Sequence, residues 1–326
     1  MQIRKLGATG PAVSAIGVGC MGMAGSYGPV DEDEAVATIH HALDLGITFF
    51  DTADFYGPGT SEQILGRALR GRREAAVIAS KTGLRFGPDG PYVDGSPEYV
   101  TSAVDESLRR LGVEYLDLYY LARIDPAVPI EETVGAMAEL VKAGKIRAIG
   151  LCEASPRSIR RAHAVHPVTA LQTEYSLWER HVEAEILPTL RELGISLVAY
   201  RPLGSGVLAS GVTLVNSLHE GDWRRGDPRL QGENLSRNAA LVEALAQVAS
   251  ERGVTPAQVA LAWVLAQGND IVPIPGSKRR THVAENAAAV DLKISDNDLS
   301  RLSEIFAAGA VGDRYPEHLL QMIDRS

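Results

Sequence analysis

One unit recurs along the whole sequence and constrains the fold more than any other feature: an apolar β-type run, a turn rich in Gly, Pro or Asp, and a segment with helical periodicity. Eight such runs predict strands: Ala15–Cys20, Thr48–Ala53, Ala76–Lys81, Leu116–Ala122, Ile146–Glu153, Ala170–Leu177, Ser196–Leu203 and Ile271–Gly276. Nearly continuous apolar runs are typical of parallel strands covered by helices. The pattern predicts an α/β fold, a single (β/α)₈ TIM barrel over residues 1–326, with a doubly wound sheet as the alternative.

Local signals mark where the intervening helices begin and end. Asp31 followed by Glu34 predicts a capping box. An N-cap residue precedes a proline in three places: Ser96–Pro97, Ser155–Pro156 and Thr255–Pro256. Glycines predict four helix ends: Gly46, Gly112, Gly144 and Gly268. Helices are therefore expected between the strands from one end of the chain to the other.

Three segments are expected to lie outside the strand–helix repeat. Residues 1–14 predict a small β-hairpin before the first barrel strand. Residues 204–237, rich in Gly, Arg, Asp and Pro, predict the longest irregular insertion, over the barrel mouth after the seventh strand. Substrate choice is expected to depend on this insertion, with Trp223, and on a C-terminal tail with Tyr315 and His318, so the sequence leaves the substrate open.

Composition excludes several classes of function. The 326 residues include 32 Lys and Arg against 41 Asp and Glu, a net charge of −9 that disfavours broad binding to nucleic acid or anionic membranes. No apolar run approaches the ~18 residues of a membrane-spanning helix. Cys20 and Cys152 are the only cysteines, which fits a reducing compartment, so a cytoplasmic protein is expected. His40 and His41 are adjacent and lack a suitably spaced third ligand, so no metal site is expected.

The segment Gly17–Gly22 matches the dinucleotide fingerprint G-x-G-x-x-G and follows a predicted strand. The next helix begins only near Asp31, so Gly22 cannot open it and no helix N-terminus would face a pyrophosphate. We therefore interpret these glycines as the lining of a strand end and not as a Rossmann loop.

Asp51, Tyr56 and Lys81 form the candidate catalytic group, because they lie at or just beyond the C-terminal ends of the second and third predicted strands. Barrel enzymes take their catalytic residues from that face. A tyrosine hydroxyl has an ordinary pKa near ~10, which an adjacent ammonium group lowers, while a carboxylate holds the ammonium in place. The alternative interpretation is a structural ion pair beside an ordinary aromatic residue.

A basic segment, Lys278, Arg279 and Arg280, follows the eighth strand and enters a helix. Cations at a helix N-terminus oppose the helix dipole, and barrels commonly bind phosphate after their last strands. The cluster therefore predicts a phosphate site, with a solvated basic turn as the alternative.

Two further strand residues are ambiguous on their own. Tyr200 ends the seventh strand, where an aromatic ring is either a core cap or a stacking platform. Gln172 is an amide in an apolar strand, so it requires a buried partner from the protein or from a ligand.

Together these residues resemble the aldo-keto reductase family over essentially the whole chain. The segments that carry the resemblance are Gly46–Gly57, Ala79–Gly83, Leu108–Gly112, Tyr115–Tyr120, Gly144–Gly150, Pro273–Ser277 and Glu285–Asn286. The run Ile159–Gln172 is similar to a branch shared by bacterial and plant members, some of which reduce alkaloid aldehydes. The resemblance implies a (β/α)₈ barrel that binds an extended NADPH across its C-terminal mouth without a Rossmann motif.

For the chemistry, the resemblance implies hydride transfer to a carbonyl carbon while Tyr56 gives a proton to the oxygen, with Lys81 lowering the Tyr56 pKa and Asp51 holding Lys81. Tyr200 would stack on the nicotinamide and Gln172 would bind its carboxamide. The implied contacts to the rest of the nicotinamide half and the pyrophosphate are Met21, Asp51, Glu153, Arg201, Pro202, Leu203, Ser205 and Gly206. Those implied for the 2′-phosphate and adenine are Gly276, Ser277, Lys278, Arg279, Arg280, Glu285 and Asn286, and the resemblance does not say which of the three cations contacts the phosphate.

Two positions depart from the family pattern. The family has Leu-His-Arg after its fourth strand, where the imidazole donates a hydrogen bond to the substrate carbonyl, whereas this chain has Leu121-Ala122-Arg123. Loss of one such donor typically costs ~10²–10³ in turnover. Cys152 stands where many relatives have serine, which weakens the hydrogen bond expected toward the nicotinamide amide.

The sequence thus predicts NADPH-dependent reduction of an aldehyde or ketone, with a catalytic tetrad altered at Ala122. The alternative is a non-catalytic NADPH-binding sensor or regulatory subunit. Ala122 favours the sensor, whereas retention of Asp51, Tyr56 and Lys81 favours the enzyme. The sequence leaves the oligomeric state open.

Overall fold

Each of the eight predicted runs corresponds to a parallel strand in the computed structural model, which describes residues 1–325. The strands are β3 (Val18–Gly19), β4 (Phe49–Asp51), β5 (Val77–Thr82), β8 (Leu118–Leu121), β9 (Ile149–Cys152), β10 (Val168–Glu174), β11 (Ser196–Tyr200) and β12 (Ile271–Pro273). Their spatial order follows the chain. The predicted (β/α)₈ arrangement is confirmed, and the doubly wound alternative is wrong, because that topology reverses direction within the sheet.

Gly17 and Gly19 close the sheet into a barrel. Gly19 pairs in parallel with Gly276, and the N–H groups of Gly17 and Gly19 donate to backbone carbonyls beside β12 at 2.9 and 3.1 Å. A Cβ at Gly17 would lie 2.8 Å from the Phe49 ring, so only glycine fits there. The first barrel helix begins only at Glu32. These glycines therefore line a strand end, as predicted, and form no Rossmann loop.

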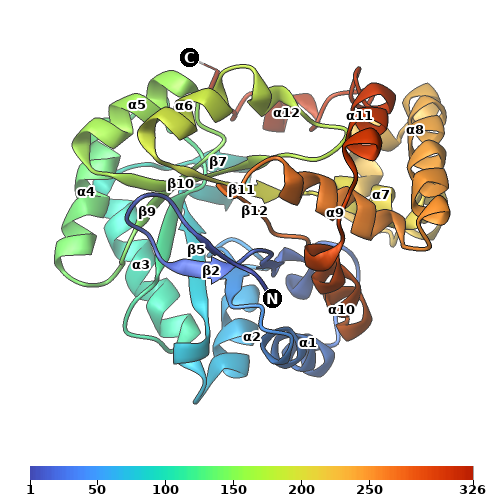
Figure 1. Cartoon of the computed structure of the whole chain (residues 1–326). Helices are drawn as coiled ribbons and strands as arrows, with labels where there is room; N and C mark the ends of the chain where they lie inside the picture. Colours follow the sequence, from blue (N-terminus) through green and yellow to red (C-terminus); the bar gives the residue numbers. More distant parts are fainter. Residues whose placement is uncertain (326) are drawn as a thin grey trace.

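Helices surround the strands in Figure 1. Those that follow barrel strands are α1 (Glu32–Asp44), α2 (Thr60–Leu69), α3 (Pro97–Leu111), α4 (Ile130–Lys142), α5 (Pro156–Val165), α6 (Ile186–Leu193), α9 (Pro256–Ala266) and α10 (Arg280–Ala288). The additional helices are α7 (Val207–Ser210), α8 (Gly232–Glu251), α11 (Asp296–Ile305) and α12 (Glu317–Leu320). One apolar layer lies between strands and helices, and a second fills the barrel interior.

The predicted N-terminal hairpin is present and covers the N-terminal end of the barrel (Figure 1). Its strands β1 (Ile3–Lys5) and β2 (Ala12–Ser14) are antiparallel. Leu6 and Val13 are fully buried and belong to the same apolar cluster as Phe49 and other residues that point into the barrel. The hairpin therefore excludes water from the barrel interior at the end opposite to the strand C-termini.

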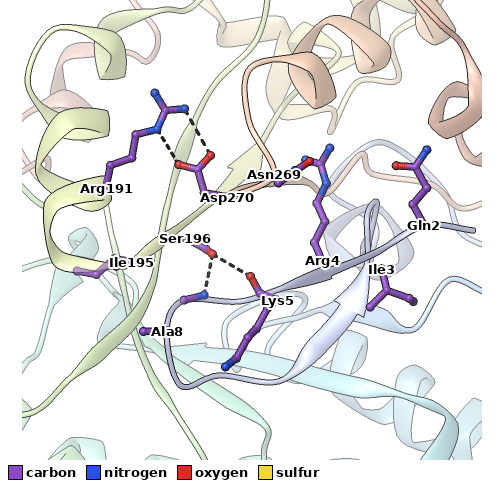
Figure 2. A pocket seen from close by; sticks show the side chains of 12 residues that line it. Gln2, Ile3, Arg4, Lys5, Ala8, Arg191, Ile195, Ser196, Asn269 and Asp270 are labelled. Carbon is purple, nitrogen blue, oxygen red and sulfur yellow. Dashed lines mark hydrogen bonds and ion pairs between the residues drawn. The ribbon is translucent and has the colours of Figure 1, made fainter.

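Arg4 of this hairpin is buried and binds backbone carbonyls between the last turn of α9 and the first residue of β12. Its guanidinium donates to Leu265 and Gly268, each at 2.9 Å, and to Ile271. Figure 2 shows Arg4 near Asn269 beside a hollow of about 800 Å³ at this end of the barrel. The side chain thus joins the N-terminal hairpin to the last turn of α9, the turn that follows it and the start of β12.

Replacing Arg4 by methionine is expected to lower the free energy of unfolding by about 2–3 kcal/mol, because buried carbonyls lose charge-assisted hydrogen bonds. Urea denaturation measures the change. Lys5→Met is the matched control, since Lys5 is exposed on the same strand. A loss no larger for Arg4→Met than for Lys5→Met would contradict this role.

The predicted helix ends are mostly confirmed. Ser96, Ser155 and Thr255 cap α3, α5 and α9 through their hydroxyls. The capping box predicted for Asp31 and Glu34 is half wrong. Asp31 accepts hydrogen bonds from the first turn of α1, but the Glu34 carboxylate pairs with Arg280 across the α1–α10 contact.

One expectation for the loops is wrong, and one hairpin was not predicted. Residues 204–237 are not irregular throughout, because they contain α7, several 3₁₀ turns and the first turns of α8. The many glycines and prolines of this segment end one short helix and precede the next, but they do not prevent helices from forming between them. A second hairpin, β6 (Leu84–Gly87) with β7 (Gly90–Val93), was not predicted. Phe86 is 65% exposed on it, so the strands lack the buried, alternating face by which a strand is detected in sequence.

Candidate active site

The barrel brings Asp51, Tyr56 and Lys81 together at the C-terminal ends of its strands. Asp51 ends β4, Lys81 lies in the neighbouring β5, and Tyr56 follows β4 in the turn before α2. The Lys81 ammonium lies 2.5 Å from Asp51 Oδ1, 2.7 Å from the Thr52 carbonyl and 3.2 Å from Tyr56 Oη. Asp51 and Lys81 are each 2% exposed, so the pair is shielded from water.

This geometry determines the direction of the hydrogen bond at Tyr56. An ammonium group has three N–H donors, and Lys81 uses them on Asp51, Thr52 and Tyr56. Tyr56 Oη therefore accepts from Lys81, and its own O–H remains free to donate elsewhere. The arrangement suits Tyr56 as a proton donor.

The pKa of Tyr56 differs in part from the prediction. Burial raises the pKa of the phenol, Lys81 lowers it, and the burial effect is the larger, so the pKa lies above its ordinary value of 10. Lys81 thus acts in the predicted direction but does not bring the pKa below normal. Burial lowers the pKa of Lys81, but Asp51 and Tyr56 outweigh burial and raise it above its ordinary value. At neutral pH the phenol is protonated and the ammonium is charged.

Gln172 reaches the same group from β10. Its Nε2 donates to Asp51 Oδ2 at 2.7 Å, which gives this amide the buried partner that its place in the strand requires. Both oxygens of Asp51 are therefore occupied, one by Lys81 and one by Gln172. The amide oxygen of Gln172 keeps its capacity to accept a hydrogen bond.

Ala122 and Cys152 lie side by side next to this group. Leu121 pairs with Leu151 in the β8–β9 ladder, so the residues that follow them are neighbours. Ala122 is 1% exposed, and its side chain offers no hydrogen-bond donor. Burial raises the pKa of Cys152 to about 12, which keeps this residue a neutral thiol.

Glu153 connects β9 to the chain's C-terminal tail. Its carboxylate accepts from Tyr200 Oη at 2.8 Å and from the Arg314 guanidinium at 2.5 Å, and Tyr200 Oη also lies 2.5 Å from Tyr315 Oη. Burial alone would raise the pKa of Glu153, but Arg314 and Arg123 outweigh burial and lower it to about 2. The tail thus holds Tyr200 and Glu153 at the rim of the barrel.

Arg201 is also committed to protein partners. Its guanidinium binds Asp227 at 2.5 Å and Glu174 at 3.3 Å, donates to Ser205 at 2.7 Å, and stacks 4.8 Å from Trp223. Its charge is therefore already neutralised by carboxylates. The insertion that contains Trp223 lies at the mouth, as predicted.

The backbone is strained at this rim. Within residues 1–325, the non-glycine residues with a positive φ are Glu153 (50°), Arg201 (49°) and Ser205 (58°). Glu153 directly follows β9 and Arg201 directly follows β11. Such conformations cost about 1–3 kcal/mol each and persist where the surroundings hold them.

The three cations after β12 have different surroundings. The Lys278 ammonium lies 2.9 Å from the Tyr27 carbonyl and 2.9 Å from the Pro29 carbonyl. Arg280 pairs with Glu34 at 2.9 Å. Arg279 is the N-cap residue of α10 and, within residues 1–325, has no ion pair or side-chain hydrogen bond. Arg279 is thus the member of the cluster whose charge has no protein partner.

The other predicted cofactor residues lie in three places. Ser277 is buried and accepts from Asn286 Nδ2 at 3.0 Å, which fixes the turn into α10, and Glu285 lies next to Asn286 on that helix. Met21 begins the 3₁₀ turn after β3. The third place is the segment that follows β11, with Pro202, Leu203, Ser205 and Gly206.

Sequence reasoning missed the charged residues that hold the rim. Arg229 binds Glu174 at 3.0 Å and also pairs with Glu179, and Arg314 binds Glu153. No local pattern marks Arg314, because it lies 161 positions from Glu153 and no motif surrounds it. Glu174 was the signal by which a buried cation could have been predicted, because it is an acidic residue in a fully buried strand. A carboxylate there requires a cationic partner.

Comparison with known proteins agrees with this geometry. Residues 15–307 match the model of the Aldo/keto reductase family. The chain belongs to the aldo-keto reductase family. It is 48% identical over 317 residues to "Probable aldo-keto reductase 1" of Glycine max, covering 96% of this chain and 90% of that protein.

Solved structures of other aldo-keto reductases share the fold. A glycerol dehydrogenase from Gluconobacter oxydans superposes with a TM-score of 0.85 at 30% identity, over 97% of this chain and 98% of that one. An aldo/keto reductase from Klebsiella pneumoniae, solved with NADP and acetate, superposes with a TM-score of 0.75 at 28% identity, over 97% and 99% of the two chains. This protein is therefore an oxidoreductase with a TIM-barrel fold.

Two features are absent from residues 1–325 of this aldo-keto reductase. No three His, Cys, Asp or Glu side chains are grouped so that they hold a metal ion. No helix is both long and apolar enough to span a membrane.

Proposed function

We propose that this aldo-keto reductase uses NADPH to reduce an aldehyde or ketone to an alcohol, with Tyr56 as the proton donor. The observation that carries this proposal is the hydrogen-bonded chain from Gln172 through Asp51 and Lys81 to Tyr56. A purely structural ion pair does not need a phenol whose O–H is left free. The NADP-bound relative from Klebsiella pneumoniae supports the choice of cofactor class.

Each residue of the hydrogen-bonded chain has its own role in the proposed reaction. Gln172 holds Asp51, Asp51 holds Lys81, and Lys81 fixes the acceptor side of Tyr56 so that the phenolic proton points away from the ammonium. The phenol is protonated at neutral pH and gives its proton to the carbonyl oxygen as negative charge develops there. NADPH, when bound, supplies the hydride that reaches the carbonyl carbon.

The donor set fits NADPH. Gln172 keeps a free amide oxygen, which accepts from the N–H of a carboxamide. Arg201 is neutralised by Asp227 and Glu174, so we assign the pyrophosphate contacts to backbone groups of Leu203–Gly206. Arg279 has no protein partner and lies at the start of α10, where an anion is stabilised by the helix dipole. We assign the 2′-phosphate contact to Arg279.

Replacing Arg279 by alanine is expected to weaken NADPH binding about 10-fold or more, with little change in NADH binding, because only NADPH carries the 2′-phosphate. Cofactor fluorescence titration measures both affinities. Arg280→Ala is the matched control, since Arg280 is paired with Glu34. Equal weakening of both cofactors by Arg279→Ala, or a larger effect of Arg280→Ala on NADPH, would contradict the assignment.

One observation favours a second candidate, a non-catalytic NADPH-binding sensor: Ala122 cannot donate the hydrogen bond that the family's histidine supplies. Single-turnover assays of NADPH oxidation separate the candidates. Slow oxidation by the wild type with a panel of aldehydes and ketones supports the enzyme. Absence of oxidation in both the wild type and Ala122→His would eliminate the enzyme and favour the sensor.

A further inference from the structure

Arg123 differs from the other cations around the barrel mouth because, among the residues that the structure describes, it forms no close ion pair, although the Glu153 carboxylate acts on its charge from a longer distance. Within residues 1–325, no carboxylate oxygen lies within 4.0 Å of its guanidinium, and its one side-chain hydrogen bond runs from Nη1 to the Ala122 carbonyl at 2.7 Å. A guanidinium has five N–H donors, so four of them have no protein acceptor. The neighbouring cations are all paired: Lys81 with Asp51, Arg314 with Glu153, Arg201 with Asp227, and Arg229 with Glu174.

The position of Arg123 relates it to the catalytic group. Arg123 follows Ala122 at the end of β8, and Ala122 lies beside Cys152 at the end of β9. Burial raises the pKa of the Cys152 thiol, while Lys81 and Arg123 are the two cations that lower it. Lys81 and Arg123 therefore both lie near enough to Cys152 for their charges to act on its thiol.

The direction of the Arg123 side chain is also informative. The Nη1 hydrogen bond folds the guanidinium back toward residue 122. Ala122 carries only a methyl group, so this site has neither the bulk nor the N–H donor of an imidazole. A permanently charged group with free donors thus lies close to the place where the family's donor is missing.

We propose that Arg123 is a catalytic residue that takes over from the missing histidine by donating a hydrogen bond to the substrate carbonyl oxygen. The proposal rests on the proposed carbonyl reduction. In that reaction the carbon gains a hydride and the oxygen gains the Tyr56 proton, and Arg123 stabilises the negative charge that develops on the oxygen. A guanidinium does not lose its proton in the physiological range, so this donor is present at every pH at which the enzyme is folded.

Double-mutant kinetics test the proposal. The wild type, Arg123→Met, Ala122→His and the double variant are compared for kcat, KM and NADPH affinity with benzaldehyde and with a benzaldehyde that carries a para-carboxylate. Arg123→Met is expected to lower kcat about 10²-fold with both aldehydes, with NADPH affinity within about threefold of wild type. The double variant is expected to recover to within about 10-fold of wild type, because the imidazole restores one donor. Arg123→Lys, which keeps a charge and fewer donors, is expected to fall between wild type and Arg123→Met.

Three results would overturn the proposal. The first is a kcat of Arg123→Met equal to that of the wild type, and the second is a loss of kcat in Arg123→Met that the added Ala122→His does not relieve. The third is an effect of Arg123→Met that appears only as a higher KM for the carboxylated aldehyde. The last result would make Arg123 an anchor for a carboxylate and not a donor to the carbonyl. Thermal unfolding and NADPH titration of each variant identify misfolding, and Arg123→Lys then decides the question. Alcohol formation by the wild type that Tyr56→Phe abolishes tests the proposed function separately from Arg123.

Discussion

Replacing Tyr56 by phenylalanine is expected to lower kcat for carbonyl reduction about 10³-fold, while NADPH affinity stays within about threefold of wild type. Phenylalanine keeps the ring, which lies 4.8 Å from the Lys81 ammonium, and removes the hydroxyl that Lys81 holds at 3.2 Å. The substitution therefore removes the proton donor and little packing. Stopped-flow measurement of NADPH oxidation with a simple aldehyde gives the single-turnover rate.

Tyr92→Phe is the matched control for Tyr56→Phe. Tyr92 is 42% exposed on β7, so loss of its hydroxyl is expected to leave the rate unchanged. If Tyr56→Phe kept more than a tenth of the wild-type rate, proton donation would have to come from another group, and the role assigned to the Asp51–Lys81–Tyr56 chain would be wrong.

The second large effect concerns stability. Arg229→Met is expected to lower the free energy of unfolding by about 3–5 kcal/mol at pH 7, because it leaves buried Glu174 with only Arg201, which is already paired with Asp227. Arg229 is 3% exposed, binds Glu174 at 3.0 Å and also pairs with Glu179. Glu174 is fully buried, so it cannot exchange the lost partner for water.

The pH dependence gives this prediction a second readout. Burial alone would raise the pKa of Glu179, but His181 and Arg229 outweigh burial and lower it to about 2. A carboxylate whose pKa is lower in the folded state stabilises the fold above its unfolded pKa of ~4.3, and this stabilisation is lost as pH falls toward 2. Without Arg229 the folded-state pKa rises, so Arg229→Met is expected to lose less stability than the wild type between pH 5 and pH 3.

Urea denaturation at pH 7, 5 and 3 measures both effects. Arg301→Met is the control, because Arg301 and Glu251 are 36% and 48% exposed and their pair is expected to contribute at most about 1 kcal/mol. Equal losses in Arg229→Met and Arg301→Met would show that the buried cluster does not stabilise the fold.

Features that depend on neighbouring residues in the chain were predictable. Apolar runs, prolines after cap residues and glycines at helix ends act over a few residues, so the eight strands and most of the helix boundaries follow from local patterns. The proximity of Asp51 and Lys81 was also predictable, because the carboxyl ends of parallel strands meet at one end of a barrel for any conformation of the loops. The β6–β7 hairpin was not predicted, because no residue of its two strands is buried and the sequence there lacks the alternating apolar pattern of a strand.

The sequence by itself determined the barrel, the family and the candidate catalytic group Asp51, Tyr56 and Lys81, since these depend on periodicity, strand ends and the spacing of residues within single segments. Only the tertiary structure decided which charges remain available. Arg314 meets Glu153 across 161 positions of the chain, Arg280 meets Glu34 across the α1–α10 contact, and both are thereby neutralised. Within residues 1–325, neither Arg123 nor Arg279 forms an ion pair with a carboxylate within 4.0 Å. The physical reason is that a charge's partner and its desolvation depend on groups brought together by folding, which no local pattern records.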